Sequence, residues 1–315
     1  MSLFWRIFLS AEFIGAAFFY VLYGRYDSLL SQAIVSSQAG ILLICTWRYM
    51  KNVEGRNPAG TIRFSLLVWG AAWALEYLAL KTGLLGALYH YGSLRFLSFG
   101  PGEVPFIVPT AWLIFGYLDG SITHFLFKRF QAKRKAPFNK SMEFLAKSLI
   151  SGWVMLSLGF SVEWHFSHIA RFWNWRPGGP SDPALGGIPL GNFILWFCFG
   201  LVIPLLERLT GAARWKYKSG SFFLQALPTL GFGVLLLAGF SMNLAYGFIL
   251  GTFFNAVSII VLGASLAPLL QLPERSQEEL PALPPFQGAS VHEFIAKCSL
   301  ERRQRAKRSL EGNPK

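Results

Sequence analysis

Acidic side chains within long apolar segments are the first candidates for chemistry in this sequence. Glu76 lies about six residues inside the end of an apolar run, roughly 9 Å deep at about 1.5 Å per helical residue. Glu163 lies near the end of another run. Charged groups are costly inside a membrane, so each such residue is a functional candidate by default. Trp69, Trp73 and Glu76 follow the spacing i, i+4, i+7, which predicts an acid and two indole rings on one helix face.

Aromatic, histidine and acidic residues crowd the two segments that follow these acids. Those after the first acid are Tyr89, His90, Tyr91 and Glu103. Those at and after the second acid are His165, His168, Trp173, Trp175 and Asp182. Both segments are predicted at the same end of the protein, so we expect an acid–aromatic layer there.

The histidines could instead bind a metal ion or haem. His165 and His168 are one helical turn apart, and His90 belongs to the same layer. No cysteine or further histidine at similar depth completes a ligand set, and His124 lies near the opposite surface. The sequence also has no GxGxxG fingerprint or phosphate-binding loop. We therefore expect no metal site and no cofactor.

A second acidic pair, Glu12 and Asp119, is predicted deeper in the membrane. Each lies about eight residues from the other end of its apolar run, roughly 12 Å deep. The two could face a shared cavity or proton path, or form a hydrogen-bonded helix contact in which one acid is protonated. Small residues nearby, including Gly15, Gly116 and Gly120, favour close helix packing.

Membrane-spanning helices must position all of these residues. Apolar residues make up 53% of the 315, and charged residues 14%, where a soluble domain has about 25%. So few charges argue against a disordered chain or an ordinary soluble enzyme. A helix needs about 20 mostly apolar residues to span a bilayer. Eight runs qualify: 4–23, 28–47, 64–82, 105–127, 145–166, 189–206, 221–240 and 246–270. The predicted fold is an all-α, polytopic membrane helical bundle.

The cations predict the orientation of this bundle. Of the 29 Lys and Arg residues, 24 fall on one side of the eight runs. The positive-inside rule then places both termini in the cytoplasm of a multi-pass cell-membrane protein, with the first run retained as a helix. The net charge of +13 is explained by this topology, so the lipid bilayer and not nucleic acid is the expected partner.

The chain changes character after the last apolar run. Residues 1–270 are predicted as the transmembrane domain, and 271–315 as a cytoplasmic segment with a Pro- and Glu-rich linker. Its last part, 291–310, is either a basic amphipathic helix on the inner leaflet or a frayed cationic tail. The three cysteines are too few and too scattered for a disulfide framework.

Two stretches of the chain look alike. Each has a helix ending in an acid, an aromatic loop, a Gly-x-x-Pro re-entry and an aromatic helix. One runs from Glu76 to Trp112 and the other from Glu163 to Trp196. This pattern indicates a weak internal duplication. Two unrelated membrane hairpins with ordinary interfacial aromatics are the alternative.

These strings resemble the integral-membrane carotenoid biosynthesis proteins over roughly residues 64–206. The resemblance rests on Glu-x5-Thr-Gly followed by Tyr-x-Tyr, then Val-Pro-x3-Pro-x-Ala-Trp, and later Trp-x-Trp. Gly-Ile-Pro-Leu-Gly-Asn-Phe at 187–193 is the strongest string. Where relatives tend to have an aspartate pair before Trp-x-Trp, this chain has Glu163 with Ser167 and His168.

The resemblance implies a carotenoid 1,2-hydratase, acting on an acyclic end such as those of γ-carotene, lycopene or bisanhydrobacterioruberin. A proton added at C2 would give a tertiary cation at C1, which water captures. That reaction needs a protonated acid, electron-rich rings beside the cation and a polar group that orients water. We expect Glu76 as the acid and Glu163 as the second candidate, with Asn192, His165 or Tyr91 orienting the water.

The implied partner is a long polyene or isoprenoid lipid, with other carotenoid-pathway or pigment-complex membrane proteins as further candidates. The residues expected to contact the substrate are Trp69, Trp73, Tyr89, His90, Glu103, Trp112, Trp173, Trp175 and Phe193. Glu76 could instead form a structural ion pair with Arg95 or Arg171. A non-catalytic carotenoid-binding subunit or assembly factor is the alternative function, and a secondary transporter with broken helices at the midplane is a further one.

Overall fold

A computed structural model describes the central part of the chain. The described residues are 40, 42–44, 46–83, 89–92, 98–99, 104–132, 138–169, 171–175, 184–212 and 222–266. The predicted span 4–23, most of the span 28–47 and the predicted tail 271–315 lie outside them, as do Glu12 and Glu103. The division of the chain at residue 270 therefore stays a prediction.

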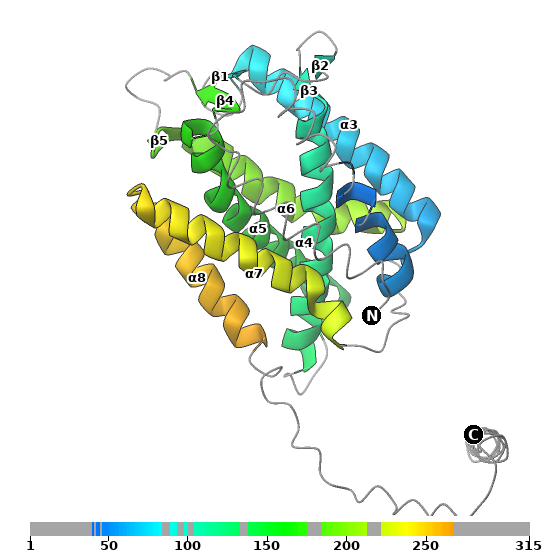
Figure 1. Ribbon diagram of the computed structural model, residues 1–315. Helices are drawn as coiled ribbons and strands as arrows, with labels where there is room; N and C mark the ends of the chain where they lie inside the picture. The colour runs from blue at the N-terminus through cyan, green and yellow to red at the C-terminus, as the bar shows by residue number, and fades with distance from the viewer. Residues whose placement is uncertain are drawn as a thin grey trace, which may run out of the picture. The chain divides into compact units, whose positions relative to one another are not determined.

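Long α-helices dominate the described residues and form a bundle (Figure 1). They are α3 (Pro58–Thr82), α4 (Ile107–Ala132), α5 (Lys140–Trp164), α6 (Leu190–Thr210), α7 (Phe222–Ala245) and α8 (Ile249–Leu266). Two short π-helical segments, η1 (Met50–Glu54) and η2 (His165–Ile169), precede α3 and follow α5. Each predicted span from 64–82 onward overlaps one of these helices, so the helical fold is confirmed. The count of eight spans and the orientation stay predictions.

Local sequence signals explain where several helices begin and end. Proline at the first position of α3 costs no hydrogen bond, because that N–H has no helical partner. The Asn139 side chain caps α5 by accepting a hydrogen bond from the Met142 N–H at 2.8 Å. Gly83 and Gly211 end α3 and α6 in the left-handed region, at φ of 67° and 78°, where a side chain would be strained.

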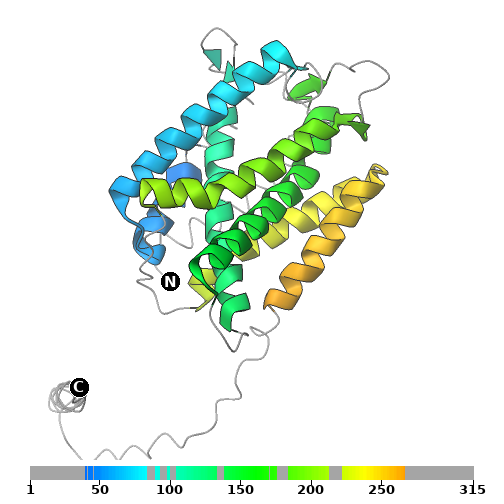
Figure 2. The same cartoon turned by 180° about the vertical axis from the view of Figure 1, so that it is seen from behind.

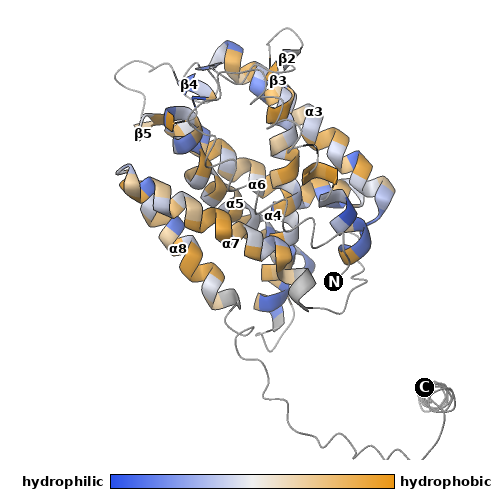
Figure 3. Cartoon of the chain, in the orientation of Figure 1, coloured by the Kyte–Doolittle hydropathy of each residue, from blue (hydrophilic) through white to orange (hydrophobic). Residues whose placement is uncertain are grey.

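The helices have the surface of a membrane protein. Within the described residues, four helical segments are long and apolar enough to cross a bilayer: Pro58–Thr82, Lys140–Ile169, Leu190–Thr210 and Ala226–Ala245. Large apolar side chains such as Leu66, Leu209 and Ile249 are exposed on these and neighbouring helices. Hydrophobic residues predominate along the helices in Figure 3. Such a surface is stable when lipid surrounds it.

Short strands gather at one end of the bundle, as both views show (Figures 1 and 2). Antiparallel pairs join β1 (Tyr89–Tyr91) to β4 (Trp173–Trp175), β2 (Ser98–Phe99) to β3 (Val104–Pro105) and β5 (Ala184–Leu185) to β6 (Ile188–Pro189). The sequence predicted only aromatic loops here. The fold is mostly helical, as expected, but these strands are an addition to it.

The β1–β4 pair joins the two stretches that look alike in sequence. Tyr89 lies opposite Trp175, His90 opposite Asn174, and Tyr91 opposite Trp173. One half consists of α3, β1, β3 and α4, and the other of α5, β4, β6 and α6. The order of elements is the same in both halves, which supports the predicted duplication.

The two halves also keep the same register where each returns to the bundle. Trp112 stands seven residues after Pro105 at the end of β3, and Trp196 stands seven residues after Pro189 at the end of β6. Each tryptophan therefore occupies the equivalent position of its own helix, α4 or α6.

Close packing between helices fixes the second half. Gly200 of α6 lies against α5, where an added Cβ would come within 2.7 Å of the Gly152 Cα. Small residues at such crossings let two backbones approach within a membrane. On another side of α5, the Ser157 hydroxyl forms a hydrogen bond of 2.7 Å with the Ser258 hydroxyl of α8. These contacts hold α5, which carries Glu163, on two sides.

Candidate functional site

Glu76 accepts hydrogen bonds from three aromatic side chains. The Tyr89 hydroxyl donates to its Oε2, and the Tyr91 hydroxyl donates to the same oxygen at 2.9 Å. The Trp112 indole N–H donates to Oε1 at 2.8 Å. Three elements, α3, β1 and α4, thus converge on one carboxyl, and both of its oxygens are occupied by uncharged donors.

The alternation of strand β1 presents both tyrosines to Glu76. Successive side chains of a strand point to opposite faces, so Tyr89 and Tyr91 are buried together while His90 between them is exposed. Burial, followed by the charge of the neighbouring Glu76, raises the pKa of both phenols well above the usual value. Both tyrosines therefore stay protonated and available as donors.

Glu163 occupies the equivalent place in the second half but has fewer direct partners. It is buried in the last turn of α5, and its Oε1 accepts the indole N–H of Trp196 at 2.7 Å. Its Oε2 has no hydrogen-bond partner. Asn192 and Trp173 lie close enough to interact with this carboxyl. Neither the Asn192 amide nitrogen nor the Trp173 indole N–H meets the geometry of a direct hydrogen bond.

A tryptophan pair connects the two acids. The rings of Trp112 and Trp196 pack with centroids 4.5 Å apart and planes 35° apart. Because each indole N–H is donated to a different glutamate, the two carboxyls flank one aromatic pair. The carboxyls also interact electrostatically with each other. Two titratable groups at the N–H edges of one indole pair can perform acid–base chemistry.

Three further predicted aromatics belong to the same cluster of side chains. The Trp175 ring packs on Tyr89 at 4.8 Å, and the Trp73 ring stacks on Tyr77 at 5.9 Å. Trp173 packs against Phe166 at 5.5 Å. The structure thus brings most of the predicted substrate-binding rings together around the strand end of the bundle.

Two of the predicted aromatic residues lie in other clusters. Trp69 packs in a second cluster, where its N–H donates to Thr110 at 3.3 Å, and Phe193 stacks on Phe160 in a third. His90 is exposed on the outer face of the β1–β4 pair. His165 is buried in η2. Within the described part of the chain, no group of three His, Cys, Asp or Glu side chains could hold a metal ion.

Trp196 is the functional candidate that was not predicted. Its hydrogen bond to Glu163 matches the one that Trp112 makes to Glu76. The equal spacing of both tryptophans from the re-entry prolines was visible in the sequence. Aligning the two repeats position by position would have identified it.

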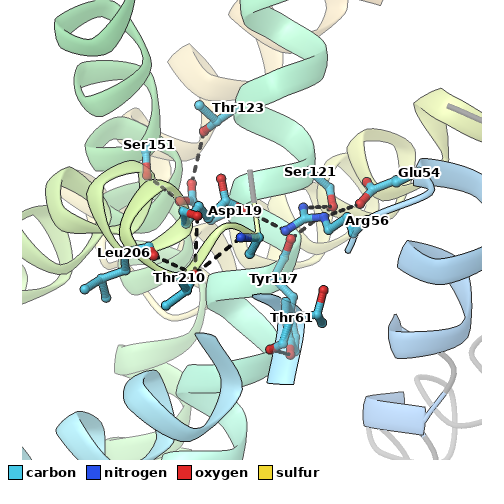
Figure 4. A network of polar contacts seen from close by, with 12 residues as sticks. Glu54, Arg56, Thr61, Tyr117, Asp119, Ser121, Thr123, Ser151, Leu206 and Thr210 are labelled. Atoms are coloured by element: carbon cyan, nitrogen blue, oxygen red, sulfur yellow. Dashed lines mark hydrogen bonds and ion pairs between the residues drawn. The ribbon is translucent and has the colours of Figure 1, made fainter. Parts of the chain in front are cut away.

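A buried ion cluster lies at the opposite end of α3 from β1. The Arg56 guanidinium donates to Glu54 and to Glu207, each at 2.6 Å, and to the Ser121 hydroxyl at 3.2 Å. Figure 4 shows Arg56 between Glu54 and Ser121. Arg56 is one of the 24 cations counted for the orientation, and its side chain is fully buried. Three segments of the chain, η1, α4 and α6, are joined by this cluster.

Asp119 forms a separate contact in the middle of α4 (Figure 4). Thr123 and Ser151 both contact its carboxyl, and the Ser151 hydroxyl also lies 2.5 Å from the Gly200 carbonyl oxygen. A hydroxyl has one proton to donate, and a carbonyl can only accept. The geometry therefore fits a protonated Asp119 that donates to Ser151 while Ser151 donates to Gly200. The prediction concerned Asp119 together with Glu12, and because Glu12 lies outside the described residues it stays a prediction.

Comparison with known families identifies the family of this chain. The sequence matches the carotenoid biosynthesis protein family over residues 34–262, which is most of the chain. The chain belongs to the carotenoid biosynthesis protein family. The match covers both halves of the repeat, including Glu76, Glu163 and the tryptophan pair. Neither the curated proteins nor the solved structures that were compared contained a match.

Proposed function

We propose that this protein is a hydratase that adds water to the terminal isopropylidene double bond of an acyclic carotenoid. The observation that carries the proposal is the pair of carboxyls, Glu76 and Glu163, bound to the two packed indoles of Trp112 and Trp196 in a member of a carotenoid biosynthesis family. Hydration of an alkene needs an acid and water but no redox cofactor, so these side chains supply the required chemistry.

Glu76 is proposed as the acid that protonates C2 of the polyene end. An alkene is a weak base, so the acid must give up its proton readily. The three donors to Glu76 stabilise the carboxylate as it forms, because hydrogen bonds to a charged acceptor are stronger than those to a neutral one. Depth within a membrane helix favours a neutral carboxyl before the reaction.

The aromatic rings that surround the two acids are proposed to stabilise the tertiary cation at C1. A cation beside an indole face gains about 0.5 to 2 kcal/mol, and more burial increases the gain. An aromatic face attracts the cation without forming a bond to it. The cation therefore survives until water reaches it.

The membrane arrangement completes the proposal. Eight spans in the cell membrane, with both termini in the cytoplasm, would place the strand end at the outer surface. A carotenoid is a rigid lipid-soluble rod, so it would enter sideways from the bilayer with its end near Glu76. Other carotenoid-pathway proteins are proposed as partners that supply the acyclic polyene.

The direct test is expression in hosts that make lycopene or γ-carotene, followed by mass analysis of the pigments. We expect a gain of one water for each modified end, with oxygen taken from labelled water. Glu76→Gln should reduce this product about a hundredfold or more. Glu143→Gln is the matched control, because Glu143 forms only a surface pair with Lys147 on α5.

The alternative is a carotenoid-binding subunit, which the aromatic surroundings of the two acids would also suit. Unchanged pigments in every acyclic host, together with pigment that copurifies equally with wild type and Glu76→Gln, would favour that function and reject the hydratase.

A further inference from the structure

Three buried polar atoms lie close together at Glu163 in the second half of the repeat, and none of them makes a hydrogen bond of ordinary geometry. They are the Glu163 Oε2, the Asn192 amide nitrogen and the Trp173 indole nitrogen. Glu163 and Asn192 are 4% and 3% exposed. A buried polar atom without a hydrogen bond destabilises the folded protein, so a group of three requires an explanation.

The three atoms have complementary chemistry. The amide nitrogen and the indole nitrogen are donors, and the carboxyl oxygen is an acceptor. Their hydrogen-bonding needs match those of one small molecule that accepts two hydrogen bonds and donates one. Water does this, and buried waters typically make about three hydrogen bonds to polar groups of this kind.

The first half of the repeat lacks this arrangement. Asn192 stands three residues after Pro189, and the residue three after Pro105 is Val108. On the strands, Trp173 is equivalent to Tyr89, which donates directly to Glu76. Both oxygens of the first acid thus accept direct hydrogen bonds, whereas one oxygen of the second acid and the two donors close to it make no hydrogen bond of ordinary geometry. The duplication has produced two carboxyls with different surroundings.

We propose that Glu163, Asn192 and Trp173 hold the water molecule that is consumed, and that Glu163 is the base that accepts its proton. This inference rests on the proposed hydratase function and assigns its second half-reaction. Asn192 and Trp173 act as positioning residues, because they orient the water and do not exchange protons with the substrate.

The proposed steps balance. The O–H bond of Glu76 breaks, its proton bonds to C2, and the double-bond electrons form that C–H bond, which leaves C1 as a tertiary cation. The water oxygen then bonds to C1 while one of its protons passes to the Glu163 carboxylate. The product is a tertiary alcohol. Glu76 has lost one proton and Glu163 has gained one. Transfer of a proton from Glu163 back to Glu76 restores the enzyme.

Heavy water separates the two half-reactions. Membranes that contain the full-length protein and its pigment are incubated in D2O buffer, and deuterium uptake and water addition are measured by mass in the same sample. In Glu163→Gln, Glu76 still protonates C2, but the cation returns a hydrogen from carbon to Glu76 and becomes an alkene again. We expect unhydrated pigment that carries deuterium, with hydration reduced about a hundredfold and exchange kept within about threefold.

A second variant makes the result independent of protein yield. Asn192→Ala removes one donor to the water, and we expect the ratio of hydration to exchange to fall about tenfold. The ratio does not change when less protein folds. Asn52→Ala, at an exposed position of η1, is the control and should keep the wild-type ratio.

Each other outcome has a clear meaning. If Glu163→Gln hydrates at close to the wild-type rate, or if Asn192→Ala keeps the wild-type ratio, the water site is overturned. If Glu163→Gln loses exchange together with hydration at normal protein levels, Glu163 is not a separate base. A wild-type protein that shows neither hydration nor exchange rejects the hydratase function itself.

Discussion

Trp112 and Trp196 pack with their ring centroids 4.5 Å apart, and each donates its indole N–H to a glutamate of its own half of the chain. Neither indole can move without disturbing the other ring and a carboxyl. The acids are therefore held at fixed positions on either side of the ring pair. Catalysis that depends on orientation requires acidic groups held in fixed positions in this way.

The phenol donors to Glu76 should contribute to rate. Tyr91→Phe keeps the ring and removes one hydrogen bond to the developing carboxylate, so we expect hydration to fall about tenfold to a hundredfold. Pigment mass analysis at matched protein level measures it. Tyr246→Phe, an exposed tyrosine beside Trp164, should leave the yield unchanged. Equal yields from the two variants would mean that the Tyr91 hydroxyl has no part in the reaction.

The same tyrosines predict a fall in stability at high pH. Burial, then the Glu76 charge, raises the pKa of Tyr89 and Tyr91 in the folded protein. Their contribution is complete below the ordinary tyrosine pKa of about 10 and is lost as the pH rises above it, because the unfolded chain then releases protons that the folded protein keeps. Thermal unfolding in detergent from pH 8 to 12 should show this loss. A double Tyr→Phe variant at both positions should show a smaller one.

Arg56 should be essential for folding stability. Arg56→Met leaves Glu54 and Glu207 buried without their cation, which costs about 3–5 kcal/mol. Thermal unfolding of the purified Arg56→Met protein measures this loss of stability as a lower midpoint temperature. Arg208→Met is the control, because Arg208 is exposed on α6, and its midpoint should stay near that of the wild type. Similar midpoints for both variants would contradict the buried cluster.

A methyl group at the α5–α6 crossing should push the helices apart. In Gly200→Ala the new Cβ would overlap the Gly152 backbone, so we expect a clear loss of stability and of folded yield. Gly231→Ala on α7 is matched in chemistry and has no atom within 4 Å of the new Cβ. It should be neutral or slightly stabilising, because alanine favours helices. Fluorescence size-exclusion profiles of both variants in detergent compare them directly.

The apolar runs predicted the described helices well, because lipid requires every spanning segment to satisfy its own backbone. The run 189–206, for example, became Leu190–Thr210. The spacing of Trp69, Trp73 and Glu76 also predicted that Glu76 lies beside aromatic rings near the end of its helix. The rings that donate to Glu76 are those of Tyr89, Tyr91 and Trp112, whereas Trp69 of its predicted helix face packs in another cluster.

Long-range pairing was harder to predict. Strands β1 and β4 have three residues each, too few for a periodic pattern, and their partners lie more than 80 positions apart. The ion cluster was missed for a similar reason. Arg56 stands in a basic segment, and its burial depends on Glu207 at the far end of α6 as well as on the neighbouring Glu54. Neither relationship is visible in a local window of sequence.

The register of β1 against β4 also bears on ancestry. The two strands of an antiparallel pair are related by a local two-fold axis. The same symmetry lets two identical chains bind each other through the same surface. A half-length ancestor could therefore have made this ribbon with a second copy of itself and carried two equal glutamates across the axis. Fusion of the copies would have released each half to change alone, one gaining tyrosines and the other an asparagine.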